Sequence, residues 1–180
     1  MPSYTIFANN IANAQSKNML AISNAAASGK LIKIYRVWIT NPTTGTVSGG
    51  MTGFLLGRCN AIHSGGTATN FLPHSSCVSA GAATPFTGIS AATGATTITA
   101  TMATEFRRVF KASDELTASS GTLDEIENLL PWAVVWDTGY ADTNVEPFVI
   151  RGGQCFLIRT DASPSNAVGG FTFHVELTIV

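Results

Sequence analysis

Within the last twelve residues of the chain, GGFTFHVELTIV, apolar and polar side chains alternate from Phe171 to Ile179. Apolar residues occupy the odd positions from Phe171 to Ile179, and Thr172, His174 and Glu176 are among the residues between them. A period of two places the apolar side chains on one face, as in an antiparallel strand that covers a core on one side only. This segment is the strongest local signal in the sequence, and it predicts a half-buried β-strand.

Similar signals recur along the chain, where β-branched and aromatic residues cluster between Gly, Pro and Asn turn residues. They predict further strands at 3–8, 18–23, 29–40, 49–62, 96–102, 105–110, 133–136, 146–150 and 154–160. Only 120–130, SGTLDEIENLL, has helical features, with a Ser or Thr cap, acidic first turns and Pro131 after its end. We expect residues 1–180 to form one all-β domain, a jelly-roll-like antiparallel β-sandwich with at most one short helix.

The segment GKLIKIYRVWIT (29–40) differs from the other strands in its pattern. Apolar residues fall at both odd and even positions, for example at Val37 and Trp38. Strands that are apolar on both faces are usually buried on both faces. The pattern therefore predicts a central strand that is covered on both sides.

Charged residues make up only 12% of the chain, about half the usual share. Thr, Ser, Gly, Ala and Asn replace them, and such a neutral polar surface costs little to desolvate when another protein covers it. Residues 1–104 hold five bases and no acid, whereas all 11 acids lie after residue 104 beside five bases, which gives +5 and −6 for the two parts. Complementary patches of this kind suit contacts between copies. Five scattered bases are too few for a nucleic-acid interface.

The N-terminal MPSYTIFANN lacks the basic and apolar regions of a signal peptide, and no apolar run approaches membrane-spanning length. We therefore expect a protein that is made in the cytoplasm and has no membrane partner. Three cysteines, at positions 59, 77 and 155, are odd in number and widely spaced. This is no disulfide framework, so reduced thiols are expected.

The stretch from Cys59 to Thr104 contains no Asp, Glu, Lys or Arg, and its centre is rich in Ala, Thr, Gly and Ser. A loop of this length is uncommon in a compact domain unless it is functional or ordered by a partner. We interpret 64–104 as an uncharged excursion that lies on another subunit. The alternative is a disordered surface loop.

Cys59, His63, His74 and Cys77 follow the pattern C-x3-H-x10-H-x2-C. Two close pairs of nitrogen and sulfur ligands could complete a tetrahedral zinc site, and residues four apart on a strand share a face. The spacing matches no zinc-finger pattern, and Cys59 fits a buried strand position equally well. These four residues are the zinc candidates, although we expect no bound metal.

The stretch VVWDTGYADTNVEP (134–147) crowds three carboxylates around a turn glycine. Asp137, Asp142, Asn144 and Glu146 could bind calcium, but they do not follow the EF-hand pattern. The alternative is a loop between two strands in which Asp137 and Asp142 accept backbone N–H groups as Asx turns. We favour this turn.

In the turn interpretation, Glu146 is available to pair with a base. Arg107, Arg108 and Arg151 are the candidates for this ion pair.

An enzyme is not expected. A carboxylate pair for glycoside hydrolysis would need a cleft in which Trp132, Trp136 and Tyr140 stack on sugars, but these residues fit core aromatics as well. There is no G-x-S-x-G motif, and neither a Walker nor a Rossmann glycine pattern is present. His174 lies on the polar face of the last strand, where a solvated histidine is ordinary. We predict no catalytic residues and no cofactor.

Four segments together resemble small structural proteins of tailed-bacteriophage virions. They are SYTIFANNIANAQSKNMLAISNAAASGKLIKIYRVWITN, FRRVFKASDE, LDEIENLLPWAVVWDTGYADTNVEPFVIRGGQ and FTFHVELTIV. The resemblance covers most of the chain except 64–104, includes no catalytic motif and transfers no functional residues. It implies a β-sandwich, often trimeric, in a capsid-associated role.

The expected function is therefore that of a capsid decoration or cement protein in the virion. Its partners would be copies of itself, as a trimer, and a major capsid protein. The alternative is a carbohydrate-binding β-sandwich of a virion fibre, tail or host-attachment device, which would bind a glycan.

Overall fold

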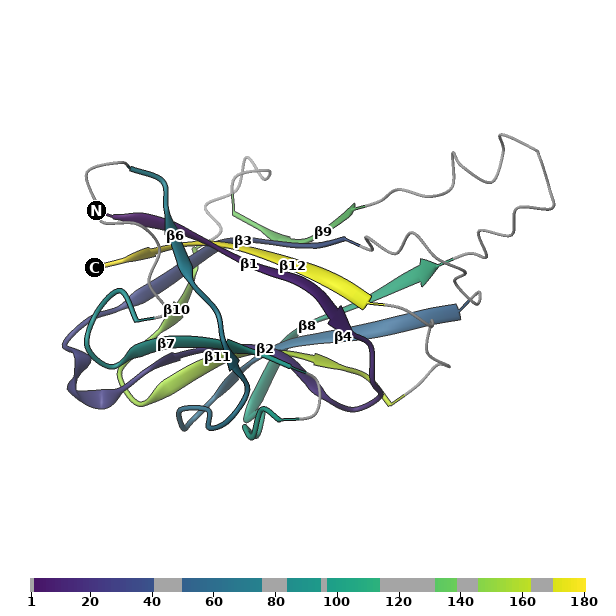
Figure 1. The fold of residues 1–180 in the computed structure, drawn as a ribbon, viewed down its shortest axis with the longest axis horizontal. Helices are drawn as coiled ribbons and strands as arrows, with labels where there is room; N and C mark the ends of the chain where they lie inside the picture. The colour runs from purple at the N-terminus through teal and green to yellow at the C-terminus, as the bar shows by residue number, and fades with distance from the viewer. Residues whose placement is uncertain are drawn as a thin grey trace.

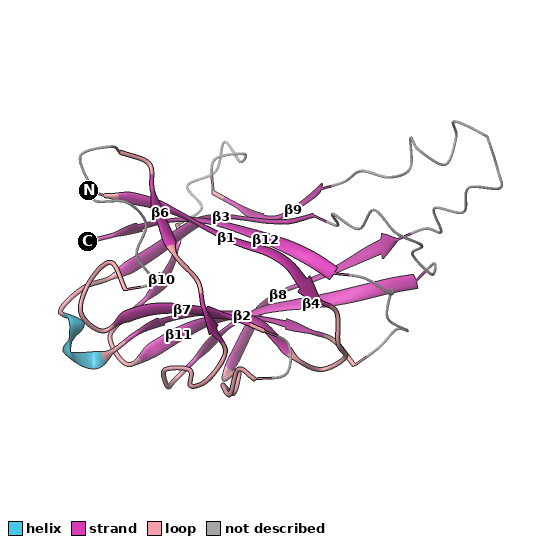
Figure 2. Ribbon diagram, in the orientation of Figure 1, coloured by secondary structure: helices cyan, strands magenta, loops and turns pink. Residues whose placement is uncertain are grey.

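The computed structural model describes residues 2–40, 50–75, 84–94, 97–113, 132–138, 146–162 and 170–180. The strands are β1 (Ser3–Ala12), β2 (Asn18–Asn24), β3 (Ile32–Thr40), β4 (Gly50–Cys59), β5 (Thr67–Ala68), β6 (Phe71–Pro73), β7 (Ile89–Thr93), β8 (Thr104–Ser113), β9 (Trp132–Asp137), β10 (Phe148–Ile150), β11 (Gln154–Thr160) and β12 (Gly170–Ile179). Within the described ranges the only helix is a 3-10 turn, η1 (Ala26–Ser28), visible in Figure 2. The helix predicted at 120–130 lies outside these ranges.

The strands form two antiparallel sheets that pack face to face, as Figure 1 shows. Sheet A has the order β10–β3–β12–β1–β6, and β9 pairs with β3 as well. Since β10 pairs with residues 32–34 of β3 and β9 with residues 36–40, the two share one edge of that strand. Sheet B has the order β5–β7–β2–β11–β4–β8. The predicted antiparallel β-sandwich is confirmed.

The connectivity is that of a jelly roll. With β5, β6 and β7 set aside and β9 and β10 counted as one position, eight strand positions remain. The first pairs with the last (β1 with β12), the second with the seventh (β2 with β11), the third with the sixth (β3 with β9 and β10) and the fourth with the fifth (β4 with β8). A long hairpin rolled into two sheets has this pairing. Each sheet therefore combines strands from both ends of the sequence.

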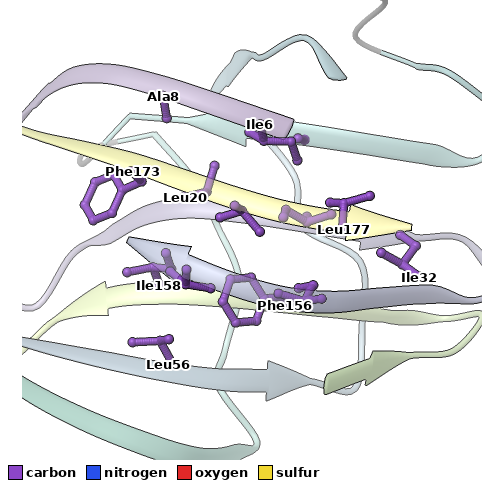
Figure 3. Close-up of a cluster of buried hydrophobic side chains, with 14 of the residues drawn as sticks. Ile6, Ala8, Leu20, Ile32, Leu56, Phe156, Ile158, Phe173 and Leu177 are labelled. Atoms are coloured by element: carbon purple, nitrogen blue, oxygen red, sulfur yellow. The ribbon is translucent and has the colours of Figure 1, made fainter. Parts of the chain in front are cut away.

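The core lies between the two sheets and consists of large apolar side chains with almost no exposed surface. Figure 3 shows Ile6, Phe173 and Leu177 of sheet A on one side of it and Phe156 and Ile158 of sheet B on the other. The apolar positions of the last strand, from Phe171 to Ile179, are all buried, as the alternation predicted.

β3 is the central strand that the sequence predicted, but only one of its faces is buried in the core. Ile32 and Ile34 face the core, and so do Val37 and Ile39. The inward positions change from even to odd because Tyr35 is an extra residue in the pairing with β12, which matches Arg36 with Glu176 and then Ile34 with Leu177. Such a bulge shifts the alternation by one residue. The sequence suggested two buried faces because the buried positions change from even to odd within this one strand.

The described parts of 64–104 pack on their own sandwich, and contact with another subunit stays a prediction. β6 pairs with β1 at the edge of sheet A, while β7 pairs with β2 and β5 with β7 at the edge of sheet B. The strand expected at 96–102 is limited to one bridge between Ser64 and Thr99. The excursion thus widens both sheets of its own chain.

Residues 97–103, called the cap below, cover part of the outer face of sheet B. Ile98, Ala100 and Met102 pack against a second apolar cluster that includes Ala21 and Leu157. The Asn18 side-chain amide fixes the cap by donating to the carbonyl oxygens of Ile98 (3.1 Å) and Ala100 (2.9 Å). Part of one outer face of the sandwich is therefore covered by the chain itself.

Candidate functional site

The outer face of sheet A carries an aromatic row that crosses three strands. Phe7, His174 and Trp38 lie side by side because Phe7 of β1 is in register with His174 of β12, which is in register with Trp38 of β3. Ring centroids are 4.7 Å apart between Phe7 and His174 and 6.0 Å apart between His174 and Trp38. Phe7 is 42% exposed. Burial among its neighbours lowers the pKa of His174, which Glu176 opposes.

An ion-pair network borders this row. The Arg36 guanidinium lies 5.1 Å from the Trp38 ring centroid, a cation–π contact. Its Nε donates to Asp137 Oδ2 at 2.6 Å, and its Nη1 lies 3.5 Å from Glu176 Oε2. Aromatic area and charges of both signs therefore meet on one sheet face.

Asp137, the first residue of the calcium candidate, is placed by this network. It stands opposite Arg36 in the β3–β9 register, and its side chain is 5% exposed. Its carboxylate is thus neutralised across the sheet by a guanidinium, which the Asx-turn interpretation did not include. Asp142 and Asn144 lie outside the described residues, and Glu146 is exposed.

The predicted ion pair of Glu146 does not form among the described residues. Arg108 binds Glu105 instead, with Nε 2.9 Å from Oε1, and its Nη1 lies 3.1 Å from Asp161 Oδ2. No ion pair joins Glu146 to Arg107 or Arg151, both of which the structure describes. The backbone N–H of Asp161 donates to the carbonyl oxygen of Gly53 on β4, and the Asp161 carboxylate reaches Arg108 on the neighbouring strand β8.

The zinc candidates divide between the two sheets. Cys59 is buried at the end of β4 in sheet B, whereas His74 follows β6 in sheet A and its Nε2 lies 2.7 Å from Thr5 Oγ1. Cys77 lies outside the described residues. Within the described ranges no three His, Cys, Asp or Glu side chains form a group that could hold a metal ion.

Cys59 and His63 belong to a different arrangement, which we call the thiol row. Ser23 of β2, Cys155 of β11 and Cys59 of β4 are successive partners across sheet B. The two thiols are hydrogen-bonded to each other. His63 covers Ser23, with Nδ1 2.5 Å from its Oγ and its own backbone N–H donating to that oxygen at 2.9 Å. The sequence did not reveal this row because Cys155 is remote from the other members.

Protonation in the thiol row follows from burial and hydrogen bonding. The hydrogen bond with Cys155 lowers the pKa of Cys59, while the same bond and burial raise the pKa of Cys155. Burial also lowers the pKa of His63. The pair therefore favours a Cys59 acceptor and a protonated Cys155 donor. Ser23 is 2% exposed, so its contact with His63 orders the sheet and presents no open nucleophile.

A cleft of about 620 Å³ opens at the edge of the sandwich where β10 approaches β8 and β4. This edge cleft is lined by Arg58, Thr104, Phe106, Trp136, Glu146, Pro147, Phe148, Val149, Arg151 and Gln154. The Phe106 and Phe148 rings stack at 4.3 Å, and the Arg58 guanidinium lies 4.9 Å from the Phe148 centroid. Trp136 packs edge-on against Phe106 and contacts the core, in agreement with the core-aromatic interpretation.

Two buried donors in this cleft have no hydrogen-bond partner, namely Arg58 Nε and Trp136 Nε1.

Comparison with protein-family models, curated proteins and solved structures gives no match for this chain. No helix among the described residues has the length and apolar character needed to cross a membrane.

Proposed function

We propose that this protein is a structural component of a tailed-phage virion, a capsid decoration protein that docks on the assembled shell through the outer face of sheet A. The observation that carries the proposal is the contrast between the two outer faces. The cap covers part of the outer face of sheet B, where Phe110 stays exposed on β8, whereas on sheet A the exposed Phe7 belongs to a row of three aromatic rings.

The composition of the sheet A face suits a protein partner. Aromatic residues are enriched at the centres of protein interfaces, and charges at their rims. The row of Phe7, His174 and Trp38 is bordered by Arg36, Asp137 and Glu176, in which both signs are present. A nucleic acid or an anionic membrane would instead select for clustered bases. Leu72, which is 44% exposed, joins Phe7 in a groove of about 380 Å³ and extends the apolar area.

A decoration protein acts by mass action. It binds the assembled lattice and not free shell subunits, which stabilises the lattice. Many copies on one shell, or several docking faces in one oligomer, make modest single contacts sufficient. The low charge content and jelly-roll sandwich of this chain support such a role, since jelly rolls occur in viral shells. They also occur in lectins, so the exposed row and not the fold carries the argument.

The test compares two exposed phenylalanines on opposite sheets. Phe7→Ser should weaken binding to assembled shells of the major capsid protein by about 30-fold, the effect of losing an aromatic hot spot of about 2 kcal/mol. Phe110→Ser is the matched control, because Phe110 is 52% exposed on β8 of sheet B. Co-sedimentation with shells measures binding, and circular dichroism confirms that both variants are folded.

Equal binding by Phe7→Ser and Phe110→Ser would exclude the sheet A face as the docking surface. Failure of the wild-type protein to bind shells would refute the decoration role itself. Native mass spectrometry of the same samples, with and without EDTA, should give a trimer of unchanged mass.

The edge cleft favours a second candidate function, the binding of a glycan by a host-attachment device. The stacked aromatic rings and the exposed Glu146 are groups that a sugar can contact. A glycan array should then show binding that Glu146→Gln abolishes and Glu105→Gln, an exposed glutamate outside the cleft, retains. No glycan bound by the wild-type protein would exclude this function.

A further inference from the structure

The two cysteines of the thiol row are neighbouring nucleophilic side chains that the docking and cleft proposals leave unused. Cys59 and Cys155 face each other in register on neighbouring antiparallel strands, β4 and β11. Both are free thiols, 1% and 0% exposed, and they are hydrogen-bonded to each other. Two thiols in this position can react with each other without a change of fold.

Strand geometry places the two residues within disulfide distance. Directly opposed residues on antiparallel strands have Cα atoms about 4.5 to 5.5 Å apart. Disulfides join residues whose Cα atoms are about 4.4 to 6.8 Å apart. A bond between these sulfurs therefore needs side-chain rotation and little backbone movement.

We propose that Cys59 and Cys155 are a modification site at which a peroxide forms a cross-strand disulfide between β4 and β11. This inference is independent of the proposed docking function. It concerns a change that the protein undergoes after it leaves the reducing compartment in which the sequence predicts that it is made.

The reaction has two balanced steps. The Cys59 thiolate attacks one oxygen of hydrogen peroxide, which breaks the O–O bond, gives Cys59 sulfenic acid and releases hydroxide. The hydroxide combines with the proton that the Cys59 thiol lost when it ionised, and the product is water. The Cys155 sulfur then attacks the sulfenic sulfur, and the hydroxyl group leaves with the Cys155 proton as a second water. The two thiols are oxidised together and one peroxide is reduced.

The surroundings favour these separate roles. The hydrogen bond with Cys155 lowers the pKa of Cys59, which favours the thiolate that reacts with peroxide, whereas burial acts in the opposite direction. Cys155 keeps its proton and stands ready to resolve the sulfenic acid, with Ser23 on its other side as a hydrogen-bond partner. The attacking and resolving sulfurs are therefore adjacent before the reaction starts.

Access to the sulfurs is controlled by the cap. Ile98 and Met102 belong to the apolar cluster that buries both cysteines. The cap contains no strand of its own. It is joined to the fold by the Asn18 amide, the Ser64–Thr99 bridge and a hydrogen bond from the Ala103 N–H to the Arg58 carbonyl oxygen. Segments with few backbone pairs open more readily than sheet strands. Peroxide, a small neutral oxidant, would enter through such openings.

The disulfide would constrain the unfolded chain strongly, because Cys59 and Cys155 are 96 positions apart (155 − 59). Crosslinks that close loops of this size give the largest entropic stabilisation. We expect the oxidised protein to melt about 10 °C higher than the reduced protein.

The experiment uses the full chain with Cys77→Ser, which leaves only the proposed pair. The protein is treated with hydrogen peroxide, and a sample unfolded in urea receives the same treatment. Intact mass should decrease by two hydrogen atoms, peptide mapping under non-reducing conditions should join the Cys59 and Cys155 peptides, and dithiothreitol should reverse both changes. Adding Cys59→Ala should prevent the mass loss and the rise in melting temperature.

Two results would overturn the proposal. In one, both thiols of the folded protein stay free after the unfolded sample has been oxidised completely. In the other, Cys59 gains oxygen atoms without forming a crosslink, which would mean that Cys155 cannot reach its sulfur. The wild-type protein provides a further check, since a crosslink that preferentially involves Cys77 would contradict the preorganised pair.

Discussion

Phe54→Ala should lower the free energy of unfolding by about 3–5 kcal/mol. Phe54 is fully buried on β4, and its ring centroid lies 4.9 Å from that of Phe171 and 5.8 Å from that of Phe173, both on β12. It therefore joins sheet B to sheet A through edge-on aromatic contacts, and truncation leaves a cavity between the sheets. Urea unfolding measures the loss, and the melting temperature should decrease by roughly 10 °C or more.

Phe110→Ala is the matched control for this truncation. Phe110 lies on the strand next to β4, in register with Gly53, but its side chain is 52% exposed. Exposed substitutions usually change stability by less than about 0.5 kcal/mol. Equal losses for the two variants would show that Phe54 does not lie between the sheets. A double variant with Phe173→Ala should lose less than the sum of the single variants, because the two rings share one contact.

Most of the strands could be predicted from the sequence because alternation marks a strand with one buried face. Nine of the ten predicted segments contain a strand of the structure, and the last strand has the predicted buried face throughout. Alternation failed to predict which face is buried where the backbone of a strand has a bulge. At Tyr35 the inward positions of β3 change from even to odd, and periodicity alone makes that change look like coverage on both sides.

The composition of the excursion did not predict that its described parts pair with both sheets of their own chain. The stretch before Thr104 has no charge, which suggested contact with another subunit. In the structure, Ile98, Ala100 and Met102 of this stretch pack on the apolar outer face of sheet B. The alternation of Ile98, Ala100 and Met102 did indicate a buried face, but the segment has no long strand partner. The very short strands β5 and β6 are below the length at which periodicity is informative.

The candidate sites could be predicted only in part, since they depend on contacts between remote residues. Trp136 was interpreted correctly as a core aromatic, because an apolar run surrounds it. The Arg36–Asp137 ion pair and the Cys59–Cys155 pair arise from strand register in a rolled hairpin, and no local pattern encodes that register. The zinc pattern, by contrast, was local in sequence but divided between the sheets by the fold.

Gly57→Ala should destabilise the protein by about 3 kcal/mol, as expected when a methyl group is forced into a packed region. Gly57 lies on β4 beneath the cap. A Cβ atom there would be 2.4 Å from Met102 Sδ and 2.5 Å from the carbonyl oxygen of Thr104. Met102 is flexible and can move, whereas the Thr104 backbone is held by the β4–β8 pairing. The cap must therefore lift, or the two strands must separate locally.

The clash with Met102 and the clash with the Thr104 oxygen can be separated by combining variants and by measuring thiol reactivity together with stability. Met102→Ala in the Gly57→Ala background should restore only part of the lost stability, because the Thr104 oxygen remains in place. Gly29→Ala is the control for a glycine with open space around it, where only the positive φ of 63° opposes a side chain. Lifting the cap should also speed the labelling of Cys59 and Cys155 by a small thiol reagent in Gly57→Ala, but not in Gly29→Ala. Unchanged stability and unchanged labelling in Gly57→Ala would mean that the cap does not lie against β4, and the path for peroxide to the thiol row would then have to run elsewhere.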